Sequence, residues 1–122
     1  MRTPWFPLGS ILLAVAVAGG ALGAHLLRAR LAPPSLALWE TAVRYLIVAG
    51  GGLVAAGLAH DLKPHAWWTA AGSCLASGAA LFSGTVAALA FGGPRWLGAV
   101  TPLGGVLIIA GFAVSAGAAL RR

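Results

Sequence analysis

Long apolar segments without ionisable residues dominate the pattern of this chain. The longest runs from Ala66 to Gly93, twenty-eight consecutive residues with no Asp, Glu, Lys, Arg or His. A helix of about 20 apolar residues crosses the hydrocarbon core of a bilayer, and soluble domains seldom contain so long a charge-free run. The segment therefore predicts a membrane-spanning helix.

Three further apolar segments predict three more spans, separated by turn-forming residues. Pro33 and Pro34 break the helical pattern after the first segment, and the residues 92–96 form a Gly-Gly-Pro turn before the last. Pro102 is expected to open the last span at an N1-like position, and the short connections make neighbouring helices antiparallel. The expected spans cover about residues 8–27, 39–60, 66–91 and 102–120. The predicted fold class is all-α: one integral membrane domain over residues 1–122, with four transmembrane helices in an up-and-down antiparallel bundle.

The N-terminal segment also has features of a secretory signal. Arg2 precedes an apolar run from Ile11 to Ala18, with small residues around a possible cleavage position. The apolar segment continues to Leu27, however, which is long enough to span. We therefore expect a retained first helix.

Composition and charge support a membrane class and argue against nucleic acid as a partner. Apolar residues make up 60% of the chain and charged residues 8%, whereas about 25% charged is usual for soluble domains. The formal net charge is +6, but the cations lie between apolar segments and form no basic stripe. Arg2, Lys63, Arg121 and Arg122 fall on the side of the two termini, and Arg28, Arg30, Arg44 and Arg95 on the other. Because Arg44 lies inside a helix and Arg2 precedes the first span, we expect both termini in the cytoplasm.

Small residues recur every fourth position along the third span and predict a close helix contact. In lipid, helices associate where small side chains let backbones approach closely. The row consists of Gly72, Ala76, Ala80, Gly84 and Ala88. Shorter rows are Ala16, Gly20 and Ala24; Gly51, Ala55 and Ala59; and Gly111, Ser115 and Ala119. The contact could form inside the bundle or between chains. Gly50-Gly51-Gly52 either loosens its helix or, as we prefer, admits a neighbouring helix.

Few residues could support catalysis. The two carboxylates, Glu40 and Asp61, lie about 30 Å apart along one helix, too far to share acid and base work. No nucleophile, base and orienting group can be assembled, so we expect no enzyme activity. Glu40 and Arg44 are spaced i, i+4 and are expected to form an intramembrane polar pair.

The histidines and the single cysteine predict no cofactor. His25 falls on the opposite membrane side from His60 and His65, so these helices cannot present a histidine pair to a haem. A metal site formed by His60, His65 and Asp61 is conceivable, but histidines at the ends of membrane helices commonly contact head groups or cap helices. Cys74 lies in an apolar run without a second cysteine and is expected to be a packing residue.

Several local motifs together resemble a known family. They are Gly20-Ala-Leu-Gly-Ala-His25-Leu-Leu, Thr41-Ala-Val-Arg-Tyr45, Leu81-Phe-Ser-Gly-Thr85, Thr101-Pro-Leu-Gly-Gly105 and Ala110-Gly-Phe112. In order and over nearly the whole chain, they are similar to the small four-helix membrane proteins of domain-of-unknown-function family four-twenty-three, relatives of transmembrane protein two-five-six. The resemblance implies a bacterial inner-membrane or mitochondrial location and no established activity. The chain departs from the family around Tyr45, where the family commonly carries Gln and His and this chain has Arg44, Leu46 and Ala49, and at Ala87, where Tyr is usual.

These observations favour an accessory or stabilising subunit that binds other membrane-protein subunits, or copies of itself, through helix packing. The alternative is an oligomeric channel or transporter for ions or small solutes, with a path near Glu40, Arg44 and His25. A third possibility is a lipid-binding role in which the basic loops contact anionic head groups.

Overall fold

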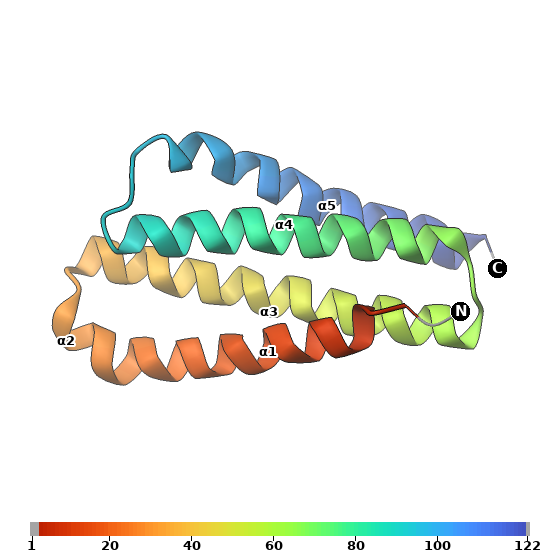
Figure 1. Cartoon of the computed structure of the whole chain (residues 1–122), viewed down its shortest axis with the longest axis horizontal. Helices are drawn as coiled ribbons and strands as arrows, with labels where there is room; N and C mark the ends of the chain where they lie inside the picture. The colour runs from red at the N-terminus through yellow and green to blue at the C-terminus, as the bar shows by residue number, and fades with distance from the viewer. Residues whose placement is uncertain (1–2, 122) are drawn as a thin grey trace.

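A computed structural model describes residues 3–121, and this part of the chain is helical apart from short connections (Figure 1). Helix α1 (Trp5–Leu22) continues into a π-helical turn, η1 (Gly23–Leu27), and a single turn, α2 (Arg28–Arg30). Three long helices follow, α3 (Pro33–Leu62), α4 (Ala66–Ala90) and α5 (Leu97–Leu120). They run alternately up and down, so the start of α1 and the end of α5 lie at the same end of the molecule.

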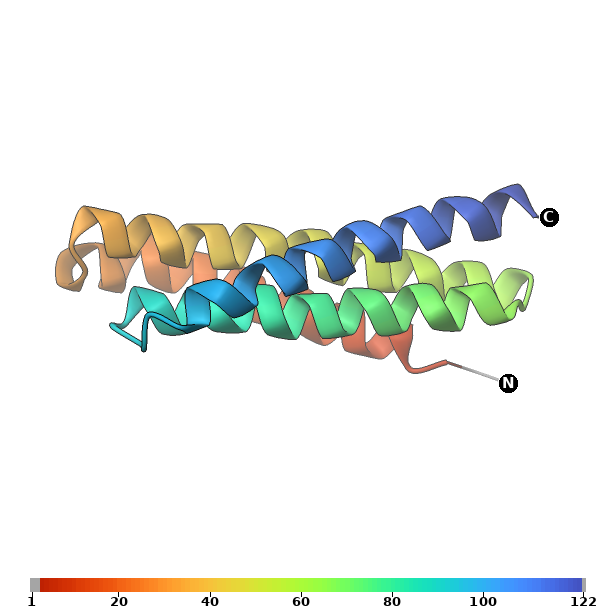
Figure 2. The same cartoon turned by 90° about the horizontal axis from the view of Figure 1, so that it is seen from above.

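The helices pack mainly against their neighbours in the chain, in the order α1, α3, α4, α5. Helices α3 and α4 form the centre, and α1 and α5 flank them (Figure 1). Figure 2 shows that α5 runs obliquely to the other three. The four helices therefore form an open layer, in which α1 and α5 do not pack extensively against each other, rather than a closed four-helix bundle.

The predicted all-α membrane fold is confirmed. Within residues 3–121, four helical segments are long and apolar enough to cross a bilayer: Trp5–Arg30, Pro33–Leu62, Ala66–Ala90 and Leu97–Leu120. Large apolar side chains cover the outside, with Val17 68% and Ile109 71% exposed. Such a surface is suited to contact with lipid.

Three prolines occupy different helix positions from those expected. Pro33 and Pro34 lie in the first turn of α3, where the missing N–H costs nothing, so the helix begins well before Trp39. The expectation that Pro102 opens the last span is wrong, because α5 begins at Leu97 and contains Pro102 in its interior. Proline then deprives the carbonyl four residues earlier of its helical partner. The turn predicted at residues 92–96 is present, and Gly92 has a φ of 85°, which favours glycine.

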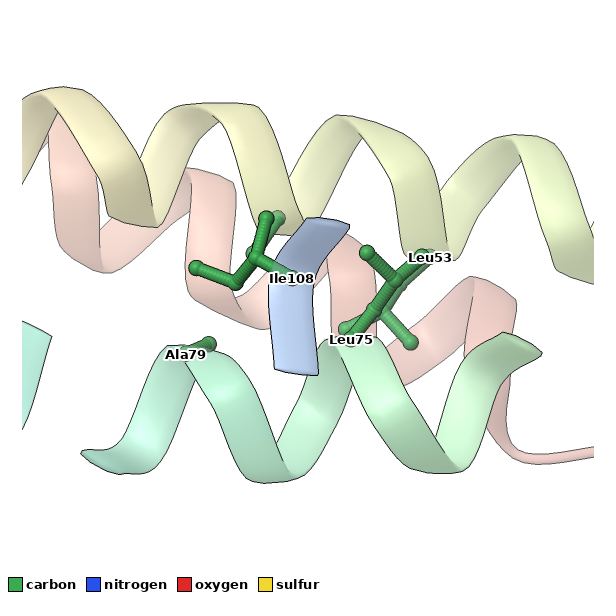
Figure 3. Close-up of a cluster of buried hydrophobic side chains, with 5 residues drawn as sticks. Leu53, Leu75, Ala79 and Ile108 are labelled. Atoms are coloured by element: carbon green, nitrogen blue, oxygen red, sulfur yellow. The ribbon is translucent and has the colours of Figure 1, made fainter. Parts of the chain in front are cut away.

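The core lies between α3, α4 and α5 and consists of few large side chains (Figure 3). Leu53 and Leu75 are fully buried and face one another, with Ala49, Ala79 and Ile108 around them. Gly52 leaves space for this cluster, since a Cβ atom there would come within 2.9 Å of the Leu75 side chain. Helix α3 stays α-helical through all three consecutive glycines. Gly50 admits α1, and Gly52 admits side chains of α4 and α5, as the preferred interpretation expects, but Gly51 is exposed and faces no neighbouring helix.

Candidate functional site

An apolar groove runs between α1 and α4, with α3 as its floor. Its volume is about 430 Å³. It is lined by Leu8, Leu12, Val15 and Gly19 of α1, by Trp39, Ala42, Val43 and Leu46 of α3, and by Ala76, Ala79, Ala80, Ser83, Gly84 and Ala87 of α4. We call it the α1–α4 groove.

Close packing of α1 on α3 fixes one wall of the groove. A Cβ atom at Gly9 would lie 2.6 Å from the Gly50 carbonyl oxygen and 2.7 Å from the Val54 nitrogen. Only glycine allows so close a backbone approach. The buried small residues of the first span are Gly9 and Ala16 of α1 and Gly23 of η1, each about two turns from the next.

Two tryptophans of the bundle pack on glycines of other helical segments, and one of them, Trp39, lines the groove. The Trp5 ring packs directly on Gly72 of α4. Farther along, Trp39 Nε1 donates a hydrogen bond to the Gly19 carbonyl oxygen (2.9 Å), and its ring packs on Gly23. Between these contacts the α4 wall carries mainly alanine and glycine, which are too short to reach α1. The groove therefore follows from where the sequence places large and small side chains.

The side-chain donors of Ser83 and Trp39, which line the groove, are hydrogen-bonded within the chain, whereas the buried Nε1 of Trp5, outside this lining, has no hydrogen-bond partner. Ser83 is buried, and its Oγ donates to the Ala42 carbonyl oxygen (2.8 Å), which ties α4 to α3. Trp39 Nε1 is bonded to α1, and none of the described residues that line the groove is charged. A surface of this kind binds apolar groups by packing, because it offers neither acid nor base.

The predicted small-residue row of α4 turns gradually from the interior to the outside. Gly72 is buried against Trp5, whereas Ala80, Gly84 and Ala88 are exposed. A Cβ atom at Gly84 would meet nothing within 4 Å. The cause is geometric: at 3.6 residues per turn, a strict four-residue repeat advances about 40° per step around the helix. The first part of the row thus packs inside the chain, and its later part is not covered by this chain.

Two of the shorter rows show the same drift, and the row that begins at Gly51 is exposed over its first two members. Ala16 and Gly111 are buried, but Ala24, Ala55 and Ala119 are exposed. Nothing approaches a Cβ atom placed at Gly51 within 4 Å. These rows therefore do not form continuous contact faces within the chain.

Glu40 and Arg44 lie one turn apart on the outer face of α3, and both are exposed. They line a shallow pocket beside Gly20 and Gly23 of the first span. Neither side chain forms an ion pair, with a nitrogen–oxygen distance of 4.0 Å or less, to another described residue. The pairing of Glu40 with Arg44 therefore stays a prediction. With 30 residues, α3 is about 45 Å long, whereas the hydrocarbon core is about 30 Å thick. The first turns of α3 therefore extend into the interfacial region.

The histidines lie at opposite ends of the bundle. His25 is exposed on η1, while His60 and His65 meet at the turn between α3 and α4. The His65 N–H donates to His60 Nδ1 (3.4 Å), and His65 Nδ1 accepts from the Trp67 N–H (3.0 Å). His65 thus caps α4. Among residues 3–121 no group of three His, Cys, Asp or Glu could hold a metal ion.

The motifs behind the family resemblance serve helix packing in the part of the chain described. Thr85 and Thr101 share a hydrogen bond of 2.6 Å between α4 and α5. Gly104 admits the backbone of Phe82, which a Cβ atom would overlap. The sequence analysis did not predict the glycine contacts of Trp5 and Trp39. The seven-residue repeat of small residues in the first span could have indicated its contact face.

The fold and the groove define a small multi-pass membrane protein without a recognisable reaction centre among its described residues. A family model described as "Protein of unknown function (DUF423)" matches residues 19–105. The chain belongs to this family.

Named relatives agree with this membership. The chain is 39% identical over 106 residues to UPF0382 membrane protein SH2409 of Staphylococcus haemolyticus, covering 86% of this chain and 85% of that protein. It is 41% identical over 103 residues to YwdK of Bacillus subtilis, covering 84% of each chain. The inner membrane protein YgdD of Escherichia coli is 31% identical over 105 residues, covering 86% of this chain and 80% of YgdD. No solved structure matches the chain. Because these relatives are named membrane proteins and four helical segments are long and apolar enough to cross a bilayer, the chain is embedded in a lipid bilayer.

Proposed function

We propose that this protein is a non-enzymatic accessory subunit that binds a transmembrane helix of another membrane protein in the α1–α4 groove. The observation that carries the proposal is the uncovered wall of small residues at Ala80 and Gly84. Hydrophobic attraction between helices is weak in lipid, so association depends on shape and on close backbone contact. A groove with one small-residue wall supplies both.

The groove is better suited to a helix than to transport. Its lining carries no charge among the described residues, whereas ion and solute paths through membranes are usually marked by ionisable groups. Glu40 and Arg44 lie in the first half of α3 and do not line the groove, although the pocket that they line adjoins it and shares Trp39 and Val43 with it. The rival function, an oligomeric channel, is distinguished below by what assembles with the chain.

We further propose that the chain resides in the cytoplasmic membrane of a bacterium with both termini in the cytoplasm. The printed name of the Escherichia coli relative supports the inner membrane. The charges give weaker support, and two of them, Arg2 and Arg122, lie outside the described residues. A reporter fused after the last residue tests this orientation: activity of a cytoplasmic reporter is expected, and activity of an external one contradicts it.

The association is tested by Gly84→Leu with Gly51→Leu as the matched control. Both glycines lie within long helices, and a Cβ atom at either meets nothing within 4 Å, so the first side-chain atom of each variant has room. Of these two glycines, only Gly84 lines the groove. The measurement is the protein that co-purifies stoichiometrically in a mild detergent.

We expect Gly84→Leu to lose the partner and Gly51→Leu to retain it. Helicity and elution of the isolated chain should be unchanged in both variants. If wild type and Gly84→Leu both purify as the same homo-oligomer without another protein, the accessory-subunit proposal is wrong and the channel alternative gains support.

A further inference from the structure

A second cavity lies at the end of the bundle where α3 ends, α4 begins and α5 ends. Its volume is about 260 Å³. Apolar groups form most of its wall, among them Leu62, Trp68 and Ala119, and two cations, Lys63 and Arg121, also line it. We call it the terminal cavity. It shares no residue with the α1–α4 groove.

The terminal cavity lies at the level of the lipid head groups. Three apolar spans end together there, at Leu62, Ala66 and Leu120. Trp67 and Trp68 begin α4 at the same level, and tryptophan prefers the membrane interface. The cavity therefore extends from the head-group layer toward the acyl chains.

Both charged side chains among the described residues that line the cavity are cations. Lys63 and Arg121 are the charged residues among its described lining, and Asp61, though near in sequence, is exposed and does not line it. The Arg121 guanidinium carbon lies 4.1 Å from the centre of the Trp67 ring, a cation–π contact that restrains the cation. An anion bound here would therefore meet two positive groups without a lining carboxylate.

His65 adds a hydrogen-bond donor to the cavity lining. Its Nδ1 accepts the Trp67 N–H (3.0 Å), which requires Nδ1 to be unprotonated. The neutral ring then carries its proton on Nε2 and can donate from that atom. Lysine, arginine and this imidazole are all donors suited to phosphate oxygens.

We propose that the terminal cavity binds an anionic glycerophospholipid, with its phosphodiester near Lys63 and Arg121 and the start of an acyl chain against Leu62 and Trp68. The combination of apolar wall and cationic residues fits an amphiphile, whereas a free phosphate ion would leave the apolar wall without a partner. Anionic lipids are attracted to basic groups at the membrane surface, and a cavity of fixed shape adds selectivity to that attraction. This proposal is independent of the partner helix proposed for the α1–α4 groove.

The test is a titration of the purified full-length chain in detergent, with bound lipid counted by native mass spectrometry. The probes are phosphatidylglycerol and phosphatidylcholine with identical acyl chains, and inorganic phosphate alone. The charge variant is Lys63→Gln with Arg121→Gln. Its matched control, Arg28→Gln with Arg95→Gln, removes the same charge at the opposite end of the bundle. Ala119→Phe fills the cavity from an exposed position without changing charge.

We expect one phosphatidylglycerol to bind more tightly than phosphatidylcholine. Each removed cation should weaken phosphatidylglycerol binding about fivefold, so the charge variant should bind it about 25-fold more weakly. The control pair should bind as wild type does, and Ala119→Phe should lose the tight site.

Four results would overturn the proposal. Equal binding of the two lipids would remove the anionic selectivity. Equal weakening in the control pair, or unchanged binding by Ala119→Phe, would reduce the effect to diffuse surface charge. Displacement of phosphatidylglycerol by inorganic phosphate at equal concentration would show an anion site without a lipid requirement.

Discussion

The contact of α1 with α3 should depend on the absence of a single methyl group at Gly9. A Cβ atom there would lie 2.6 Å from the Gly50 oxygen, and ordinary contact begins at 3.4 Å. The obstructing atoms are backbone, so they cannot move aside as a side chain could. In Gly9→Ala, α1 must therefore shift outward by about 0.8 Å, because the shortfall cannot be absorbed locally.

The cost follows from the packing lost in that shift. A gap of about 0.5–1 Å removes roughly a quarter to a half of the attraction of each affected atom pair. Overpacking of this kind typically costs about 1–3 kcal/mol. Replacing glycine by alanine inside a helix returns up to about 1 kcal/mol. We expect Gly9→Ala to destabilise the fold by about 1–2 kcal/mol.

Gly51→Ala is the matched control, since nothing lies within 4 Å of a Cβ atom at Gly51. It should be neutral or stabilise the fold by up to about 1 kcal/mol. The free energy of unfolding is measured in mixed micelles as sodium dodecyl sulfate is increased, with circular dichroism as the signal. The two variants should differ by about 2 kcal/mol, roughly a 30-fold change in the folding equilibrium. If they unfold at the same detergent fraction, the close α1–α3 approach does not contribute to stability.

Two further predictions concern polar groups. Ser83→Ala removes the buried hydrogen bond to the Ala42 carbonyl oxygen (2.8 Å) and should lower the free energy of unfolding by about 0.6–1.7 kcal/mol in the same assay. Ser77→Ala, the control at an exposed serine on the same helix, should lower it less. Equal effects of the two variants would contradict an interhelical role for Ser83. A double-mutant cycle with Glu40→Gln and Arg44→Leu should show a coupling of about 0.2–0.5 kcal/mol, the range of exposed i, i+4 pairs, and strict additivity would show that the two residues do not interact.

The number and approximate place of the spans could be predicted because membrane insertion depends on a one-dimensional property of the sequence. A charge-free run such as Ala66–Gly93 suits lipid wherever its neighbours lie. Helix limits were less predictable, because proline is compatible with both the first turn and the interior of a helix. Pro33 begins α3, whereas Pro102 lies inside α5, and their local sequences do not separate the two cases.

The faces of the helices were only partly predictable. The row from Gly72 to Ala88 was visible in the sequence, but a four-residue repeat drifts around a helix by about 40° per step. Its beginning therefore packs inside the chain and its end does not. The contacts of Trp5 with Gly72 and of Trp39 with Gly23 join residues on different helices. Such pairs depend on helix register, which the sequence pattern of one helix does not contain.

Site-specific photocrosslinking in cells tests the central claim, that the α1–α4 groove holds a helix of another protein. A photoreactive residue is introduced at Val15, a larger groove-lining residue that is 53% exposed, and at Ile109, which is 71% exposed on α5 and does not line the groove. We predict a discrete crosslinked protein from position 15 that is absent from position 109 and is lost when Gly84→Leu is added. Crosslinks from position 15 to lipid alone, with no protein adduct, would contradict the claim.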